Sequence, residues 1–130
     1  MDKKRILIVD DESGFTRLMK LTLERTGNYT VLEENDGTKA LDAARQFRPD
    51  LILLDIVMPT IDGGDVARQI QADPTLKKVK IVFLTAIVSN KETTPGNLIG
   101  GFPFMAKPVS LDALVKFIEA NLSGTVPAKT

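Results

Sequence analysis

Short apolar runs along the chain alternate with stretches in which apolar residues recur at helical spacing. The runs at 5–9, 51–55 and 80–86 are rich in aliphatic residues, which is typical of strands buried on both faces of a sheet. A more polar run at 29–35 predicts an edge strand. A weaker run at 101–107 contains Pro103, which fits only an edge position and so makes this segment a second edge strand.

Helical spacing predicts one helix over 13–26, one after Asp36 that ends before Pro49, one over 65–71, and one capped by Ser110. The apolar face of the first should carry Phe15, Leu18, Met19 and Leu23, and that of the last Leu111, Leu114, Val115, Ile118 and Leu122. Asp62 and Gly63 are interpreted as a turn in which Asp62 caps the third of these helices.

The alternation of strands and helices predicts an α/β fold, in which a five-stranded parallel sheet is covered by helices on both faces. A flavodoxin-like strand order, 2-1-3-4-5, fits this pattern. Between the fourth and fifth strands, Pro95 and Gly96 disfavour a helix interior, so the fourth helix of the series should be short or broken. We expect one domain over 3–122, followed by a tail over 123–130.

Composition removes several classes of function. The chain has 130 residues, with 17 Lys plus Arg and 17 Asp plus Glu, so its net charge of zero argues against non-specific nucleic-acid binding. It has no Cys and no His, which excludes thiol nucleophiles, histidine metal sites and Ser-His triads. The N-terminus shows neither a secretory signal nor a membrane-length apolar run, and we expect a cytoplasmic domain.

Acidic residues end two of the buried strands. Asp10 and Asp11 follow the first strand and Asp55 ends the third. In the expected order these strands are neighbours, and the crevice beyond their carboxyl ends is the usual ligand site of open α/β sheets. Thr85 and Lys107 end the fourth and fifth strands at the same edge. Converging carboxylates favour Mg²⁺, and an Asp carboxylate is a nucleophile toward phosphorus, so the cluster indicates metal-assisted phosphorylation of one Asp.

The chain resembles the receiver domain of two-component response regulators. The resemblance covers about residues 3–122 and is carried by "LIVDDE" (7–12), "PDLILLDIVMPTIDG" (49–63), "VFLTA" (82–86) and "FMAKP" (104–108). It implies that the domain accepts a phosphoryl group from a phosphohistidine on a sensor histidine kinase or a histidine phosphotransfer protein. It also implies that the domain signals through a changed protein-binding surface.

The resemblance assigns roles to individual residues. It implies that Asp55 accepts the phosphoryl group, that Asp11, Asp55 and the Val57 carbonyl bind Mg²⁺, and that Asp10 acts through a metal-bound water. It implies that Thr85, the Ala86 amide and Lys107 bind the phosphoryl group, with a cis bond between Lys107 and Pro108. Phe104 stands where the family keeps an aromatic switch residue that responds to Thr85, although an aromatic in a strand is equally compatible with core packing. Phe15 is compatible either with the core or with a kinase-docking face of the first helix.

Two features depart from the family pattern. Because the fourth helix is interrupted, dimerisation through the surface made by helix four, strand five and helix five is in doubt, and we expect a monomer or weak dimer. Val57 and Ile87 stand at positions that border the path of the hydrolytic water, and neither side chain can orient a water by hydrogen bonding. Autodephosphorylation of Asp55 should therefore be slow.

Other functions are weighed against this hypothesis. An Asp-nucleophile phosphatase would place a second Asp two residues after the nucleophile, where this chain has Val57. A nucleotide or flavin binder would carry a glycine-rich phosphate loop after the first strand, and none is present. The remaining alternative is a receiver-like docking module that is not phosphorylated. No direct nucleic-acid or membrane partner is expected, and output should pass through an unidentified downstream protein.

Overall fold

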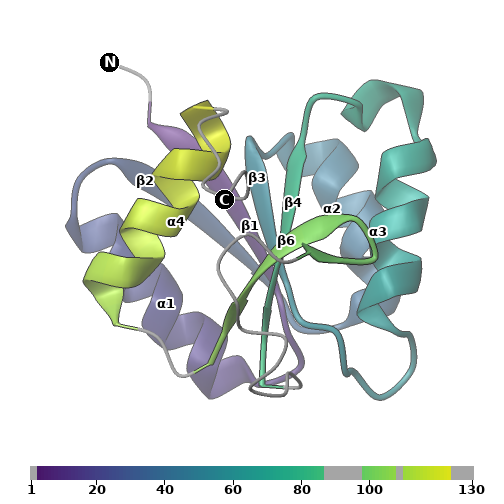
Figure 1. Ribbon diagram of the computed structural model, residues 1–130, viewed down its shortest axis with the longest axis horizontal. Coiled ribbons are helices and arrows are strands. Elements are labelled where there is room, and N and C mark those ends of the chain that lie inside the picture. The colour runs from purple at the N-terminus through teal and green to yellow at the C-terminus, as the bar shows by residue number, and fades with distance from the viewer. Residues whose placement is uncertain (1–2, 87–97, 108–109, 124–130) are drawn as a thin grey trace.

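The computed structural model describes residues 3–86, 98–107 and 110–123. Its strands are β1 (Lys4–Val9), β2 (Tyr29–Glu34), β3 (Leu51–Leu54), β4 (Lys80–Thr85), β5 (Leu98–Ile99) and β6 (Phe102–Ala106). Its α-helices are α1 (Ser13–Arg25), α2 (Ala40–Phe47), α3 (Gly63–Ala72) and α4 (Leu111–Ser123), with 3₁₀ turns at Gly37–Lys39 and Pro74–Leu76. Figure 1 shows a central sheet between α1 and α4 on one face and α2 and α3 on the other. The α/β class with helices on both faces is therefore confirmed.

The strands form one sheet in the order β2-β1-β3-β4-β6-β5. All neighbours among β2, β1, β3, β4 and β6 are parallel, so the expected 2-1-3-4-5 order is confirmed, with β6 as the expected fifth strand. The expected edge strand at 29–35 is also confirmed, because β2 ends the sheet.

The expectation that the strand containing Pro103 lies at the edge is wrong, because β5 pairs with its outer side. Gly100 and Gly101 adopt φ values of 57° and 89°, which a two-residue hairpin of this kind needs at both central positions. Pro103 faces Leu98 of β5, and the pairing with β4 begins only at Phe104. The missing N–H of the proline therefore falls before the parallel ladder starts.

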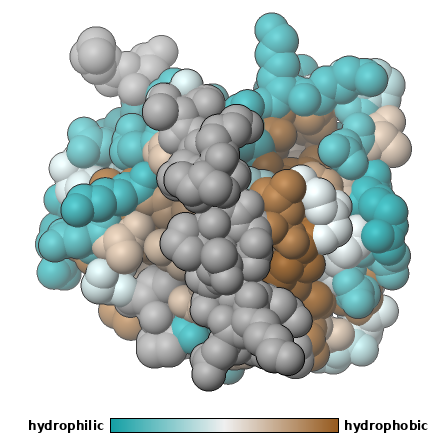
Figure 2. Space-filling model, in the orientation of Figure 1, coloured by the Kyte–Doolittle hydropathy of each residue, from teal (hydrophilic) through white to brown (hydrophobic). Residues whose placement is uncertain are grey.

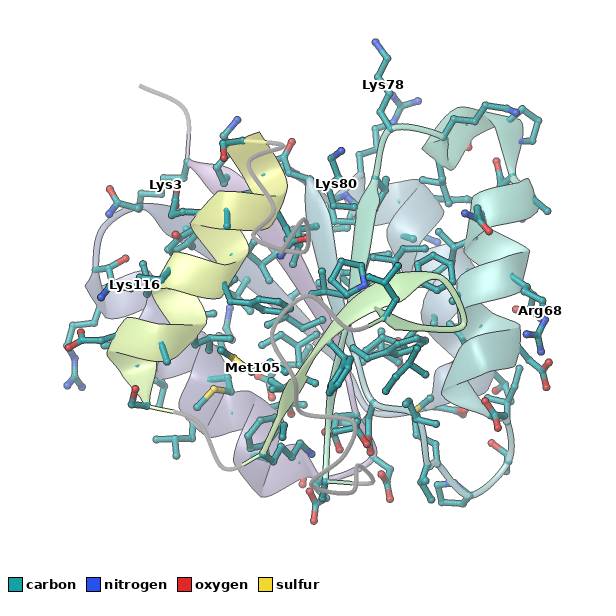
Figure 3. All side chains as sticks on the ribbon, in the orientation of Figure 1. Lys3, Arg68, Lys78, Lys80, Met105 and Lys116 are labelled. Carbon is teal, nitrogen blue, oxygen red and sulfur yellow. The ribbon has the colours of Figure 1, made fainter. Side chains whose placement is uncertain are left out.

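Alternate residues of the strands point to opposite faces of the sheet and form two apolar layers. The layer toward α2 and α3 contains Leu7, Val9, Ile52, Leu54, Ile81 and Phe83. The layer toward α1 and α4 contains Ile6, Ile8, Leu51, Leu53, Val82 and Leu84. Met105 of β6 packs on the α1 and α4 side, as Figure 3 shows. Burial on both faces explains why these strands are continuous apolar runs rather than alternating ones.

The predicted helix caps are confirmed, but two residues of the predicted apolar faces are exposed. Asp62 accepts a hydrogen bond from the Gly64 amide at the start of α3, and Ser110 caps α4 through the Ala113 amide, both as predicted. Leu18 and Leu111 do not lie on the buried faces: they are 57% and 38% exposed. Successive helical residues lie about 100° apart, so Met19 takes the position toward the sheet and turns Leu18 away from it.

Several expectations fall on parts of the chain that the structure does not describe. The predicted interruption of the fourth helix falls on residues 87–97. The next two residues, 98 and 99, form strand β5. The cis bond to Pro108, the position of Ile87 and the tail beyond residue 123 likewise lie outside the described residues. Within the described part of the chain, no helix has the length and apolar character needed to cross a membrane.

Hydrophobic side chains reach the surface between α3 and the β5–β6 hairpin, as Figure 2 shows. The cavity there, of about 510 Å³, is lined partly by Ile56, Phe83, Ile99 and Phe102. The rings of Phe83 and Phe102 pack edge to face, with their centroids 5.7 Å apart. The outer strands of the sheet are thus tied to the core by aromatic packing.

Candidate functional site

The carboxyl ends of β1, β3, β4 and β6 meet at one edge of the sheet. Backbone hydrogen bonds continue the register past the strand ends: the Asp10 amide donates to Glu34 at 3.1 Å and the Asp55 amide donates to Val9 at 2.9 Å. The Lys107 amide donates to the Thr85 carbonyl at 3.0 Å. Four of the five residues that the sequence placed at strand ends are therefore held side by side by the sheet itself.

A cavity of about 340 Å³ opens at this edge. Its lining residues are Asp11, Glu12, Asp55, Val57, Thr85, Ala86 and Lys107. Six of these seven were predicted from the sequence, and Glu12 was not. Asp10 is 1% exposed and lies beneath the cavity, where it contacts Lys107. The structure thus brings together every predicted site residue except Phe104.

Phe104 lies elsewhere. Its half-buried ring packs against the apolar layer toward α2 and α3, and it is not among the residues that line the cavity. Of the two interpretations of this residue, core packing describes the observed position. A switching role stays a prediction.

Three carboxylates converge at the cavity. Asp10, Asp11 and Asp55 each place one oxygen so that all three atoms lie within 4.8 Å of one another. Asp10 and Asp55 are buried and Asp11 is exposed. Hard carboxylate oxygens beside open space suit Mg²⁺, which keeps several waters and takes few protein ligands. The residues present therefore fit this ion.

Burial raises the pKa of the Asp55 carboxyl above its usual range, and the charge of Asp10 adds to this effect. The positive charge of Lys107 and hydrogen bonds from the Thr85 hydroxyl and the Ile56 amide act in the opposite direction. The Ile56 amide donates to Asp55 Oδ1 at 2.9 Å. A metal cation among the three carboxylate oxygens would offset both their mutual repulsion and the cost of their desolvation.

The loop after β3 places Asp55 and Val57. The Gly63 amide donates to the Ile56 carbonyl at 2.7 Å, which folds the loop back on the end of the strand. A Cβ atom on Gly63 would fall 2.7 Å from Ile56 Cα and closer still to the Asp55 carbonyl oxygen. A side chain cannot fit there, so glycine is required for this close approach.

Lys107 is held mainly by acidic groups on the β1–α1 side of the cavity. Its Nζ atom lies 2.6 Å from Asp10 Oδ2 and 3.3 Å from Glu12 Oε1. It also lies 4.2 Å from the centroid of the Phe15 ring. Burial alone would lower the pKa of Lys107, but the hydrogen bond to Asp10 and the surrounding negative charges outweigh it and the pKa is raised. Lys107 is therefore a firmly charged ammonium group.

Sequence reasoning missed three residues around the site. Glu12 stands in the quoted "LIVDDE" segment, but only its contact with Lys107 distinguishes it from any exposed acid. Phe15 was considered for the core or for docking, and its ring faces the Lys107 ammonium. The side-chain amide of Asn35 donates to the Asp10 carbonyl at 2.7 Å, a contact that no local pattern predicts.

The comparisons with known proteins agree with this geometry. The sequence model of the response regulator receiver domain family matches residues 6–119, which is nearly the whole chain. The chain belongs to the response regulator receiver domain family. It is therefore a signalling domain of the two-component type.

Curated relatives include the DNA-binding response regulator MtrA of Mycobacterium tuberculosis, which is 37% identical over 120 residues. The match covers 92% of this chain and 51% of MtrA. The alkaline phosphatase synthesis transcriptional regulatory protein PhoP of Bacillus subtilis is 37% identical over 118 residues, covering 88% of this chain and 48% of PhoP. The receiver domain thus spans about half the length of these relatives.

Solved structures give the same result. The chemotaxis protein CheY4 of Vibrio cholerae superposes with a TM-score of 0.80 at 27% identity, covering 92% of this chain and 99% of CheY4. The receiver domain of the sensor histidine kinase PA1611 of Pseudomonas aeruginosa superposes with a TM-score of 0.80 at 28% identity, covering 94% of this chain and 99% of that one. The latter structure is described as having a magnesium ion coordinated in its active-site cleft.

Proposed function

We propose that this receiver domain accepts a phosphoryl group on Asp55 and signals through the resulting change at the cavity. The observation that supports this most directly is the convergence of Asp10, Asp11, Asp55, Thr85 and Lys107, from four strand ends, on one cavity. The receiver domain is proposed to span 3–122. A docking module that is never phosphorylated would have no use for this set of residues, and we do not favour it.

In the proposed reaction, a carboxylate oxygen of Asp55 attacks the phosphorus of a phosphohistidine, the N–P bond breaks, and an acyl phosphate forms. The leaving imidazole keeps the electron pair and takes up a proton. Mg²⁺, held by Asp11, Asp55 and the Val57 carbonyl, with Asp10 acting through a water, would neutralise charge on the phosphoryl oxygens.

The chain's own residues have distinct parts in this step. The Ile56 amide holds one Asp55 oxygen and so orients the carboxylate. Thr85, Ala86 and Lys107 line the cavity. We assign the Thr85 hydroxyl, the Ala86 backbone amide and the Lys107 ammonium to the phosphoryl oxygens. Phosphorylation would add charge of about −1.5 to −2 at the cavity, enough to reposition Thr85 and Lys107.

The phosphoryl donor is proposed to be a sensor histidine kinase or a histidine phosphotransfer protein, and output is proposed to pass to a downstream protein. The curated relatives are named as DNA-binding or transcriptional regulators, but this chain spans only about half of each. Slow autodephosphorylation is proposed because Val57, which is 58% exposed and lines the cavity with Asp55, has no polar side-chain atom to orient a water. Changing Val57 to Asn should shorten the phospho-Asp55 half-life, and an unchanged half-life would count against this account.

The deciding experiment is the intact mass of the protein after incubation with acetyl phosphate. We expect one phosphoryl adduct that requires Mg²⁺, is lost in Asp55→Asn, and persists in Asp65→Asn, which alters an exposed acid on α3. If neither an adduct nor a beryllofluoride complex forms in the wild type, the docking-module alternative replaces this proposal.

A further inference from the structure

The Lys107 ammonium has acidic partners on the side of the cavity formed by the β1–α1 connection. Asp10 and Glu12 come from that connection and Phe15 from the first turn of α1. Asp55 belongs to the loop after β3, on another wall of the same cavity. Lys107 is thus ion-paired with the β1–α1 connection, although Asp55, the group that it is proposed to serve, lines the same cavity.

The two acidic partners of Lys107 differ in burial. The Asp10 side chain is 2% exposed, so its contact with Lys107 is buried. The Glu12 side chain is 66% exposed, and it contacts Lys107 among the residues that line the cavity. A carboxylate that is mostly in water, such as that of Glu12, gives up its partner to a competing anion at little cost, whereas a buried carboxylate does not. Glu12 is therefore the contact that a new anion in the cavity would displace.

Phe15 adds an aromatic face to the same cradle. Its ring lies under the ammonium at 4.2 Å, within the range of a cation–π contact, and its half-buried position packs it against the layer toward α1 and α4. This packing holds the ring in place beside the ammonium. Phe15 is not among the residues that line the cavity, so its contact with Lys107 leaves the cavity open. Phe15 thereby connects the position of the Lys107 side chain to the first turn of α1.

We propose that Glu12 and Phe15 hold Lys107 in a resting position, and that Glu12 competes with a phosphoryl group on Asp55 for this ammonium. The inference rests on the function proposed above and names Glu12 as a positioning residue for it. Weakening the Glu12 contact should make the loaded state easier to reach. Loading should in turn free the Glu12 carboxylate and one face of the Phe15 ring.

The test is the affinity for beryllofluoride at saturating Mg²⁺, followed by fluorine NMR. Tyr29 is the only Tyr and there is no Trp, so intrinsic fluorescence would be a poor reporter. We expect Glu12→Gln to bind beryllofluoride about twofold to fivefold more tightly, the range for loss of an ion pair whose carboxylate is exposed. Phe15→Leu, which keeps an apolar side chain but removes the ring, should act in the same direction.

Glu12→Asp separates the proposal from simple charge repulsion. It keeps the negative charge beside the cavity but withdraws the carboxylate from Lys107 by roughly one C–C bond length. The proposal expects it to resemble Glu12→Gln. If Glu12→Asp binds like the wild type while Glu12→Gln binds more tightly, repulsion alone explains the effect and the proposal is overturned.

A double-mutant cycle with Lys107→Met gives the second check. Without the ammonium, Glu12→Gln should no longer change the affinity, and an effect of the same size in that background would overturn the proposal. Asp42→Asn, an exposed acid on α2, serves as the control and should match the wild type. If the wild type forms no beryllofluoride complex and no acetyl phosphate adduct, the proposed function fails and this inference with it. If the wild type loads but the Glu12 variants match it, this inference alone fails.

Discussion

The side-chain amide of Asn35 donates hydrogen bonds to the Asp10 carbonyl at 2.7 Å and to the Thr16 hydroxyl at 2.9 Å. Asn35 directly follows β2, Asp10 begins the acidic connection, and Thr16 lies buried in α1. The Thr16 hydroxyl in turn donates to Glu33 Oε1 at 2.8 Å. One asparagine therefore ties the edge strand and the first helix to the backbone that presents Asp10 and Asp11.

Replacing Asn35 with Ala should weaken Mg²⁺ binding. The change removes two hydrogen bonds and leaves the Asp10 carbonyl without the Asn35 donor, so the carboxylates of Asp10 and Asp11 are less well positioned for the ion. The free energy of unfolding should fall by about 1 kcal/mol. Calorimetric titration with Mg²⁺ would measure the first effect and denaturant unfolding without Mg²⁺ the second. Asn28→Ala, in the exposed turn before β2, is the matched control. A variant that loses stability but binds Mg²⁺ as the wild type does would reduce Asn35 to a purely structural role.

Gly63 gives a sharper contrast. Gly63→Ala would drive a Cβ atom into the backbone of Asp55 and Ile56, so the loop that carries the acceptor must move. We expect a loss of stability of about 2 kcal/mol or more and a clear loss of beryllofluoride binding. Gly14→Ala is the control, because a Cβ there meets nothing within 4 Å and the substitution in α1 should stabilise by roughly 0.5–1 kcal/mol. Equal behaviour of the two variants would show that the close approach is unimportant.

Asp73 predicts how stability depends on pH. Its side chain accepts hydrogen bonds from the Thr75 hydroxyl and amide and from Arg45 Nε, which lower its pKa to about 2. The folded-state pKa lies below the unfolded value of about 3.9, so the stabilisation is present above pH 4 and is lost as the pH falls toward 2.

Asp73→Asn should accordingly lower the melting temperature at pH 7, and the difference from the wild type should shrink below pH 4. Thermal unfolding between pH 3 and pH 7 would test this. The control is Asp65→Asn, because Asp65 is an exposed acid of α3 paired with Arg68 on the same helix. A constant difference across this range would mean that the Asp73 carboxylate is not the titrating group.

The sequence predicted the parts of the fold that depend on local pattern. Runs such as Ile6–Val9 are buried on both faces, and this burial follows from their unbroken apolar character. The site was predictable because parallel strands end at one edge, which brings Asp55 to Asp10 whatever the details of the packing.

The rest depends on contacts between distant side chains. Lys107 contacts Asp10 and Glu12, which lie 97 and 95 residues away in the sequence. These contacts depend on the side-chain rotamers and on the position of the Phe15 ring, and no sequence pattern predicts either. The extra strand β5 was missed because two residues carry too little pattern, although the Gly100–Gly101 pair is a turn signal that could have indicated a hairpin.

The outer edge of β2 is covered at one point by side chains of α1. Glu24 Oε2 accepts from the Val31 amide at 2.9 Å, and Lys20 Nζ donates to the Val31 carbonyl at 2.6 Å. Lys20 and Glu24 also form an ion pair of 3.0 Å, one helical turn apart. Since an edge strand with free backbone groups is a template for pairing with another chain, these two side chains should prevent association through β2.

Glu24→Ala should therefore expose the Val31 amide, lower the free energy of unfolding by about 1 kcal/mol, and promote concentration-dependent self-association. The hydrogen bond from Val31 lowers the pKa of Glu24 below its usual range, so in the wild type the protection is fully present above that range and is lost only as the pH falls through the lowered folded-state pKa. Light scattering over a range of protein concentrations would detect the association. Arg25→Ala, also on the last turn of α1, is the control and should stay monomeric. A Glu24→Ala protein that is monomeric at every concentration would show that the strand edge is protected by something other than this ion pair.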